Sequence, residues 1–592
     1  MNSVSNAALG TEKVLWKLED LYSSQDDPAL TRDLELCRSE ATRLQEQYEY
    51  KIAELDGPAL CELVAALEKL ESLQGRIATF AFLNFTTRTR DAKAGAFLQK
   101  IKEFGSNIGR KTVFFELEWN RLDEKQVESL LGSHHLASYR HYLKSMRRYA
   151  PHQLSREEES LLIERAPVGR SSWNNLFDKV LGHLEFGINK RSEEEVLSDL
   201  YSADRLVRKQ AAADLTGGLK SQLHVLTHIF NTILADKMID DRLRAYPSWV
   251  SSMNLYNELE EKTVAALIES VTGRYDIVKR YYLLKRDLLG LDELVDYDRY
   301  APLPFLPETS VSWSDCRKMV LDSFAEFSGE MAEIAEKFFT DAWIHAPIIE
   351  GKRAGAFAHP CVPEVHPYVM VNYAGTLRDV STVAHELGHG VHQHLAARCG
   401  YYNSGTTLVL AETASVFAEL LLFRSQLGMI SGRKEKKAFI CQKLESIFAT
   451  VFRQVAMNRF EERIHTGRRE SGELSPEEMT VHWLESQKEM FAGSVTLTDD
   501  YGVWWSYIPH FLNTPGYVYS YAFGELLVLS LYRIYQTDSE KFVPRYLELL
   551  ASGGSMSPYE LLQPFGIDLN DKSFWLGGLE LIDDMLQEME EL

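Results

Sequence analysis

Apolar side chains recur at the spacing of an α-helix through most of the chain, with few residues that break helices. The pattern is clear from residue 27 to residue 107 and continues to about residue 187, with turns at glycine and proline. It returns in one long segment after another between residues 191 and 346. No internal repeat of about 20 to 50 residues is visible, which argues against a solenoid. We therefore predict a mostly α-helical fold.

Three short segments depart from the helical pattern. Three prolines between residues 295 and 308 predict a loop. Residues 183–190 have the character of a paired strand, and Ser192 with Glu195 fits a capping box for the helix that follows. Valine and tyrosine are frequent in residues 367–373, PYVMVNY, which glycines and prolines surround. We predict a strand there, directly before another helical segment.

Composition argues against several classes of protein. A chain of 592 residues can bury a large core and form several subdomains. The net charge of −22 argues against nucleic acid or an anionic membrane as the main partner. No apolar run reaches the roughly 18 residues of a membrane span, and no secretory signal is recognisable. Six scattered cysteines without CxxC spacing fit reduced thiols, so we expect a cytoplasmic protein. Its oligomeric state stays open.

The strongest chemical signal is His-Glu-Leu-Gly-His at residues 385–389. If residues 380–398 form one helix, His385 and His389 project from the same face, roughly 6 Å apart along the axis. Two imidazoles so placed can hold one metal ion, and Glu386 can reach a water molecule bound to it. One Zn²⁺ per chain is the expected cofactor, although cobalt and manganese also accept these ligand types.

A catalytic zinc site needs a third ligand from the protein. His392 continues the histidine face but lies about 10 Å along the helix from His385, so we assign it a packing or supporting role. Glu412 is the better candidate, on a second apolar-rich helix that a glycine-containing turn allows to run back. Its neighbours make a solvated surface charge less favourable: Leu408, Leu410, Ala411, Ala414 and Val416.

These motifs resemble those of the thimet-oligopeptidase-like metallopeptidases, specifically the oligoendopeptidase F branch. The resemblance rests on AETAS around Glu412, on residues 351–390, on VDYDRYAPLP and on a tyrosine-rich segment near residue 515. The metzincin class is excluded, because this chain has His392 and Leu395 where that motif needs glycine and histidine. The resemblance supports His385, His389 and Glu412 as the zinc ligands.

The resemblance also implies an architecture. We expect an elongated multi-helix metallopeptidase fold with a deep substrate channel and a small β-strand element beside the zinc helix. Residues 1–190 would be an N-terminal helical accessory region that helps to wall the channel. Residues 191–592 would be the catalytic domain. The edge of the strand predicted at 367–373 would bind an extended peptide through backbone hydrogen bonds, although an ordinary core strand is an equally good interpretation of the residues alone.

The segment from Thr498 to Tyr532 is dense in tryptophan and tyrosine, which is most often a sign of core packing. In the resembling family, a histidine and tyrosines from such a segment hold the substrate and stabilise the oxyanion of the reaction. The matching positions here are His510, Tyr517 and Tyr521, with Tyr519 as a competing assignment.

The sequence therefore predicts a zinc-dependent metalloendopeptidase that hydrolyses internal bonds of short unstructured oligopeptides. Zinc-activated water would attack the peptide bond with Glu386 as general base. Two alternatives stay open: a dipeptidyl carboxypeptidase or other exopeptidase on the same fold, and a non-catalytic peptide-binding protein. The intact Glu386 counts against the second alternative, because a binding protein needs no general base.

Overall fold

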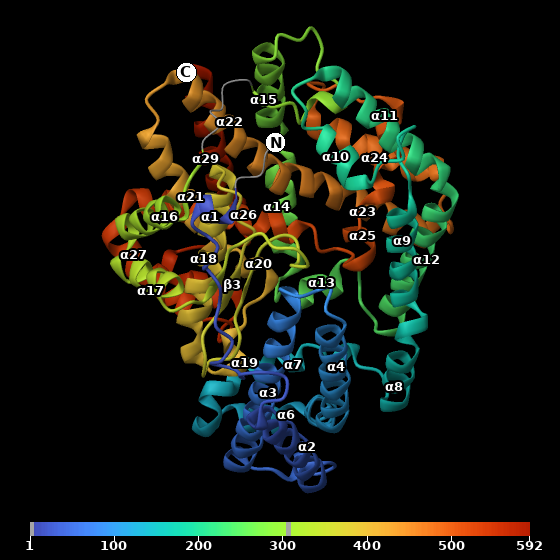
Figure 1. Ribbon diagram of the computed structural model, residues 1–592. Helices are drawn as coiled ribbons and strands as arrows, with labels where there is room; N and C mark the ends of the chain where they lie inside the picture. The colour runs from blue at the N-terminus through green and yellow to red at the C-terminus, as the bar shows by residue number, and fades with distance from the viewer. Residues whose placement is uncertain (1–4, 304–309) are drawn as a thin grey trace. The chain divides into compact units, whose positions relative to one another are not determined.

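The computed structural model describes residues 5–303 and 310–592 (Figure 1). The predicted mostly α-helical fold is confirmed. Part of the proline-rich loop predicted at 295–308 lies outside the described residues, and its described part includes a 3₁₀ turn at Asp296–Asp298. Among the described residues, none of the helices is both long and apolar enough to cross a membrane. All six cysteines are free thiols.

The chain divides into two compact units. Unit one comprises residues 1–150, 308–428 and 534–567, and unit two comprises residues 151–307, 429–533 and 568–592. The division expected at residue 190, and the deep channel implied by the resemblance, stay predictions.

Unit one contains three long helices that pack side by side near its N-terminus, α2, α3 and α4 (Figure 1). Each begins at an aspartate whose side chain accepts a hydrogen bond from a backbone amide of the first turn: Asp27, Asp56 and Asp91. The helices of the unit are α1 (Asn6–Leu9), α2 (Pro28–Tyr48), α3 (Gly57–Thr86), α4 (Ala92–Thr112), α5 (Phe114–Trp119), α6 (Glu124–Leu131), α7 (Arg140–Arg147), α16 (Trp313–Phe327), α17 (Gly329–Thr340), α18 (Leu377–Ala396), α19 (Tyr401–Ser404), α20 (Leu408–Ala411), α21 (Thr413–Met429), α27 (Ser539–Ala551) and α28 (Pro558–Leu562).

A three-stranded sheet lies beside α18 in the same unit. Its order is β1 (Ile344–His345), β3 (Tyr368–Met370) and β2 (Phe357–His359), with β1 parallel and β2 antiparallel to β3. The strand predicted at 367–373 is confirmed as β3, whose residues are all buried. β1 and β2 are too short to show a periodic pattern. β2 is an edge strand, because β3 is its neighbour on one side only.

Unit two is built from helices around a second core that contains four tryptophans, Trp483, Trp504 and Trp505 fully buried and Trp173 at its margin. The capping box predicted at Ser192 and Glu195 is confirmed. The strand expected at 183–190 is reduced to one antiparallel bridge, between Phe186 and Arg191. The helices are α8 (Arg156–Arg165), α9 (Arg170–His183), α10 (Glu193–Asp199), α11 (Arg205–Ser221), α12 (Leu223–Leu243), α13 (Ser251–Tyr256), α14 (Glu261–Thr272), α15 (Tyr275–Leu288), α22 (Arg433–Thr450), α23 (Phe452–Ser471), α24 (Pro476–Phe491), α25 (His510–Asn513) and α29 (Lys572–Glu591). Helix α26 (Tyr519–Thr537) starts in unit two and ends in unit one.

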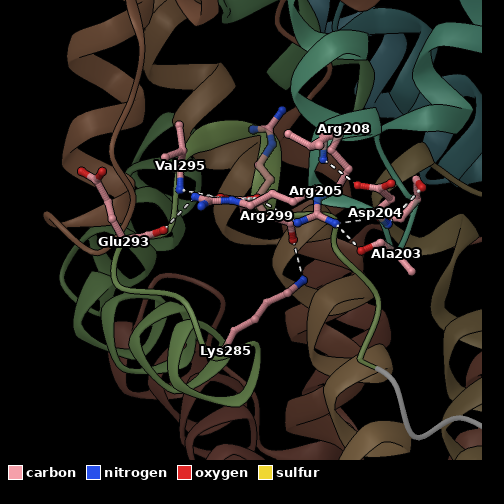
Figure 2. A network of polar contacts seen from close by, with 11 residues as sticks. Ala203, Asp204, Arg205, Arg208, Lys285, Glu293, Val295 and Arg299 are labelled. Carbon is pink, nitrogen blue, oxygen red and sulfur yellow. Dashed lines mark hydrogen bonds and ion pairs between the residues drawn. The ribbon is translucent and has the colours of Figure 1, made fainter.

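A buried polar network fixes the loop around Asp298 in unit two. Figure 2 shows Arg205 and Arg208, from α11, reaching this loop. The Asp298 carboxylate, which is fully buried, accepts hydrogen bonds from Arg205 at 2.7 Å and Arg208 at 2.8 Å. Lys285 donates to the carbonyl of Arg299 at 2.6 Å. A buried carboxylate paired in this way holds its loop in one conformation.

The same loop contacts the segment that leads to His510. The Arg299 guanidinium donates to the hydroxyl of Tyr501 at 2.7 Å and lies 5.5 Å from the ring centroid of Trp504. Both aromatic residues belong to the 3₁₀ segment Asp499–Tyr507, which ends three residues before His510. The network therefore anchors the approach to the predicted substrate-binding segment.

Candidate metal centre and active site

The two histidines of the HExxH motif lie on one unbroken helix, as predicted. Thr376 is the N-cap of α18: its hydroxyl accepts from the amide of Asp379, while the Asp379 carboxylate accepts from the amide of Thr376. This capping box starts the helix two and a half turns before His385. The imidazoles of His385 and His389 lie on the same face, with ring centroids 4.9 Å apart.

Glu412 occupies a different local structure from the one predicted. The sequence suggested that it lies within a single helix, but α20 ends at Ala411 and α21 begins at Thr413. Glu412 links the two helices: its carbonyl accepts from the amide of Val416 at 3.0 Å, which starts α21. Its carboxylate accepts from the hydroxyl of Ser415 at 2.7 Å. The hydrogen bond from Ser415, in the first turn of α21, thus holds the Glu412 carboxylate at the start of that helix.

The structure brings His385, His389 and Glu412 together. One oxygen of Glu412 lies 3.3 Å from Nε2 of His385 and 3.4 Å from Nε2 of His389. The three donor atoms lie within 4.8 Å of one another. Two imidazole nitrogens and one carboxylate oxygen are a donor set that suits a catalytic divalent ion such as zinc. The residues present therefore fit the metal that the sequence predicted.

Close contact between α18 and α21 makes this arrangement possible. A Cβ at Gly388 would lie 2.6 Å from the carbonyl oxygen of Ala414 and 2.7 Å from Cα of Ser415. Only glycine fits at such a distance from the neighbouring backbone, so Gly388 allows α21 to approach the histidine face.

Sequence reasoning missed a further acidic group, Glu419 of α21. Its carboxylate lies 2.6 Å from Nδ1 of His385, which leaves Nε2 directed to Glu412. Burial lowers the pKa of His385, but Glu419 and the other carboxylates outweigh it and raise the pKa to about 9. A carboxylate on the second ring nitrogen orients a metal-binding histidine. The sequence offered one indication of this residue: Glu419 lies seven residues, or about two helical turns, after Glu412.

The electrostatics of Glu412 and Glu386 differ. Burial raises the pKa of Glu412, but hydrogen bonding with His389 and the two imidazoles outweigh it and lower the pKa to about 2. Glu386 is 7% exposed, and burial raises the pKa of its carboxyl. The backbone of Ala358 in β2 supplies Glu386 with a hydrogen bond. Glu412 is thus held ionised, whereas Glu386 is readier to accept a proton.

His392 does not belong to the three-residue donor group. It is 7% exposed, and burial lowers its pKa to about 4, so the imidazole is neutral near pH 7. This environment agrees with a packing histidine.

Unit two brings the predicted substrate-binding residues together. Nε2 of His510 lies 3.2 Å from the hydroxyl of Tyr521, and the rings of Tyr517 and Tyr521 have centroids 4.9 Å apart. All three side chains are half-buried. Tyr519 is fully buried, and its hydroxyl accepts from Asn257 at 3.0 Å. Tyr519 is therefore a core residue, whereas His510, Tyr517 and Tyr521 form a partly accessible cluster whose role stays a prediction.

Two family models match the chain. Residues 323–581 match peptidase family M3, and residues 118–186 match oligopeptidase F. This chain belongs to the oligoendopeptidase F group of peptidase family M3. Members of the M3 family are metallopeptidases. The first match includes all seven predicted metal-binding and catalytic residues: His385, Glu386, His389, Glu412, His510, Tyr517 and Tyr521.

Curated relatives match this chain along nearly its whole length. Oligopeptidase PepF of Bacillus subtilis (strain 168) is 27% identical over 98% of this chain and 87% of its own length. An oligoendopeptidase F homolog of Lactococcus lactis (strain IL1403) is 25% identical over 98% of both chains. This M3 family member is therefore a peptidase.

Solved structures show the same fold. A structure from Chlamydophila abortus has a TM-score of 0.87 and 24% identity, with 100% of both chains covered. Oligoendopeptidase-F from Enterococcus faecium has a TM-score of 0.70 and 20% identity, with 95% of this chain and 97% of that chain covered. The helical fold with its small sheet is thus the fold of the oligoendopeptidase F structures.

Replacing Glu419 by glutamine should weaken metal binding in this M3 family member. The variant loses the carboxylate that orients His385, so we expect zinc affinity to fall about 10- to 100-fold. Competition with a chromophoric chelator measures the dissociation constant. Glu330→Gln, at an exposed position of α17, is the matched control and should bind as the wild type does. Equal affinity of Glu419→Gln and wild type would contradict the assigned orienting role.

Proposed function

We propose that this protein is a zinc-dependent endopeptidase that cuts internal bonds of short unstructured peptides. The observation that carries the proposal is the convergence of His385, His389 and Glu412, with the buried Glu386 next to His385 on α18. The family assignment supports peptide hydrolysis, and the donor set supports the metal.

The residues that would hold the ion are His385, His389 and Glu412. A bound zinc ion supplies Lewis acidity and lowers the pKa of water towards about 7. Cobalt or manganese would suit the same donor types, since ligand chemistry restricts the metal only loosely.

Glu386 is the proposed general base. Its carboxylate accepts a proton from the water that attacks the scissile carbonyl, and it then passes that proton to the leaving amine. The carboxylate is thereby restored and no acyl-enzyme forms. Burial, which raises the pKa of Glu386, makes proton acceptance more favourable than it would be for an exposed glutamate.

The outer edge of β2 is the proposed site for the peptide backbone. β2 lies against α18, and the backbone of Ala358 bonds to Glu386. The sequence interpretation placed this role on the predicted strand at 367–373, but β3 has a neighbour on each side, so β2 is the edge that a peptide could extend.

His510, Tyr517 and Tyr521 are proposed to contact the substrate and to donate hydrogen bonds to the oxyanion. Their partial exposure supports this role over core packing. The burial of Tyr519 argues for Tyr517 or Tyr521 as the donor. A cytoplasmic location with reduced thiols is proposed as well.

The function is tested with an internally quenched peptide of about ten residues, blocked at both ends, and the Glu386→Gln variant. We expect the wild type to cleave an internal bond, and the variant to lose about 100- to 10,000-fold in kcat because the general base is gone, while zinc stays bound. Mass spectrometry locates the cut, and metal analysis reports the zinc content.

Glu330→Gln is again the control and should cleave at the wild-type rate. Cleavage only of peptides with a free C-terminus would favour the exopeptidase alternative. Peptide binding without any cleavage would favour the binding-protein alternative.

If Tyr517 or Tyr521 stabilises the oxyanion and Tyr519 is a core residue, replacing each tyrosine by phenylalanine should affect different quantities. Tyr517→Phe or Tyr521→Phe should reduce kcat about 100- to 1,000-fold, with a smaller change in KM, because an oxyanion donor acts mainly in the transition state. Tyr519→Phe removes a core hydrogen bond and should instead lower stability by about 1 kcal/mol. Steady-state kinetics and thermal unfolding separate the two effects. Wild-type kcat in both Tyr517→Phe and Tyr521→Phe would contradict the oxyanion role.

A further inference from the structure

A cavity of about 700 Å³ lies within unit one at the far end of α18. It is lined by α3, by α4, by the segment that follows β2 and by the last residues of α18. Side chains on its wall include Ala78, Phe82, Leu98, Val362, Pro363 and Tyr401. A cavity of this size accommodates a ligand as large as several amino-acid side chains.

The cavity is continuous with the proposed peptide-binding edge. His359 is both the last residue of β2 and part of the cavity wall. Gln393, which also lines the cavity, lies one helical turn beyond His389 on α18. The two features are therefore joined through β2 and through the helix that carries the metal-binding histidines.

Gln393 has an unsatisfied hydrogen-bonding group at this junction. Its Nε2 donates a long 3.4 Å hydrogen bond to the carbonyl of Ala358, but its buried Oε1 has no hydrogen-bond partner. A buried amide oxygen without a partner costs free energy of about 1–3 kcal/mol. A backbone N–H of a bound peptide would satisfy it.

The backbone groups of Ala358 mark the same edge. Its backbone bonds to Glu386, and its carbonyl accepts from Gln393. Both partners belong to α18, so the backbone of Ala358 is bonded to the helix that carries the metal-binding histidines. A carbonyl oxygen has two lone pairs, so that of Ala358 can accept a second hydrogen bond from an added strand.

The cavity wall carries little charge. Burial lowers the pKa of His359 to about 4, and burial together with Lys337 lowers the pKa of His394, so both rings are neutral near pH 7. Lys102 is exposed at the wall, and the lining contains no carboxylate. Such a surface favours an apolar side chain over a charged one.

We propose that this cavity is a specificity subsite that takes a bulky apolar side chain of the peptide substrate, while Oε1 of Gln393 accepts a hydrogen bond from the peptide backbone. The inference rests on the proposed endopeptidase function and adds its side-chain preference. The occupant follows from continuity with β2: a peptide extended along that edge enters the cavity beyond His359.

The distance along α18 indicates how many residues separate that side chain of the substrate from the cleaved bond. The cavity wall on this side runs from Gln393 to Ala397, about 6 to 12 Å beyond His389 at the rise of an α-helix. An extended peptide advances about 3.3 Å per residue. The side chain in the cavity is therefore about two to four residues away from the cleaved bond.

The test uses quenched peptides that differ only in having phenylalanine or glycine at the second, third or fourth residue on either side of the cut. We expect the wild type to prefer phenylalanine over glycine at least about 10-fold in kcat/KM at one of these three positions, on one side of the cut. The preference should fall towards about 1-fold in Ala78→Trp, because the added indole projects from α3 and occupies part of the space that the phenylalanine ring would use.

Lys69→Trp, at an exposed position of α3 outside the cavity wall, is the matched control and should keep the wild-type preference. The ratio of kcat/KM values for two substrates of one enzyme does not depend on the fraction of enzyme that is folded. A poorly folded variant therefore still gives the substrate preference. An unchanged preference in Ala78→Trp overturns the inference. So does a wild type that cleaves every peptide with no preference, a result that leaves the proposed function intact.

Gln393→Leu tests the backbone contact. We expect KM to rise about 10-fold for the phenylalanine and glycine peptides alike, because the lost hydrogen bond is to the backbone. Gln99→Leu, at an exposed position of α4, is the control and should leave KM unchanged. An unchanged KM in Gln393→Leu would remove the backbone contact from the proposal.

Discussion

The close approach of α21 to α18 at Gly388 is the constraint on which the site depends. Two histidines one helical turn apart present two nitrogens by geometry alone, whereas the third donor must come from another helix. A side chain at Gly388 would collide with the backbone of α21. With glycine there, the Glu412 carboxylate lies within 3.4 Å of both imidazoles.

Negative carboxylates and positive imidazoles compensate one another in the candidate metal centre. Glu412, Glu419 and Glu386 surround the two imidazoles, and the carboxylates raise the pKa of His385 while the imidazoles lower that of Glu412. A metal ion and a proton compete for the same nitrogen, so an ion would take the place of the positive charge that these acids favour. The assignment of roles follows: Glu412 stays ionised as a donor, Glu419 orients His385, and Glu386 is the group suited to take up a proton.

Local chemistry could be predicted from the sequence where it depends on spacing within one helix. The single helix that carries His385 and His389 and the capping box at Ser192 both follow from such patterns. The break at Glu412 and the role of Glu419 depend on packing between α18 and α21, which no periodicity encodes. β2 was missed because three residues give no alternation to detect. The cluster of His510 with Tyr521 was predicted from the resemblance, and only burial separates Tyr519 from it.

The most direct test of the central claim is X-ray absorption spectroscopy of the zinc-loaded chain together with its metal content. We predict about one zinc per chain, with nitrogen and oxygen neighbours at about 2.0–2.2 Å. The ion should be lost from a His389→Ala variant that remains folded. Sulfur neighbours at about 2.3 Å, or undiminished zinc in that variant, would contradict the assignment of His385, His389 and Glu412 as the metal centre.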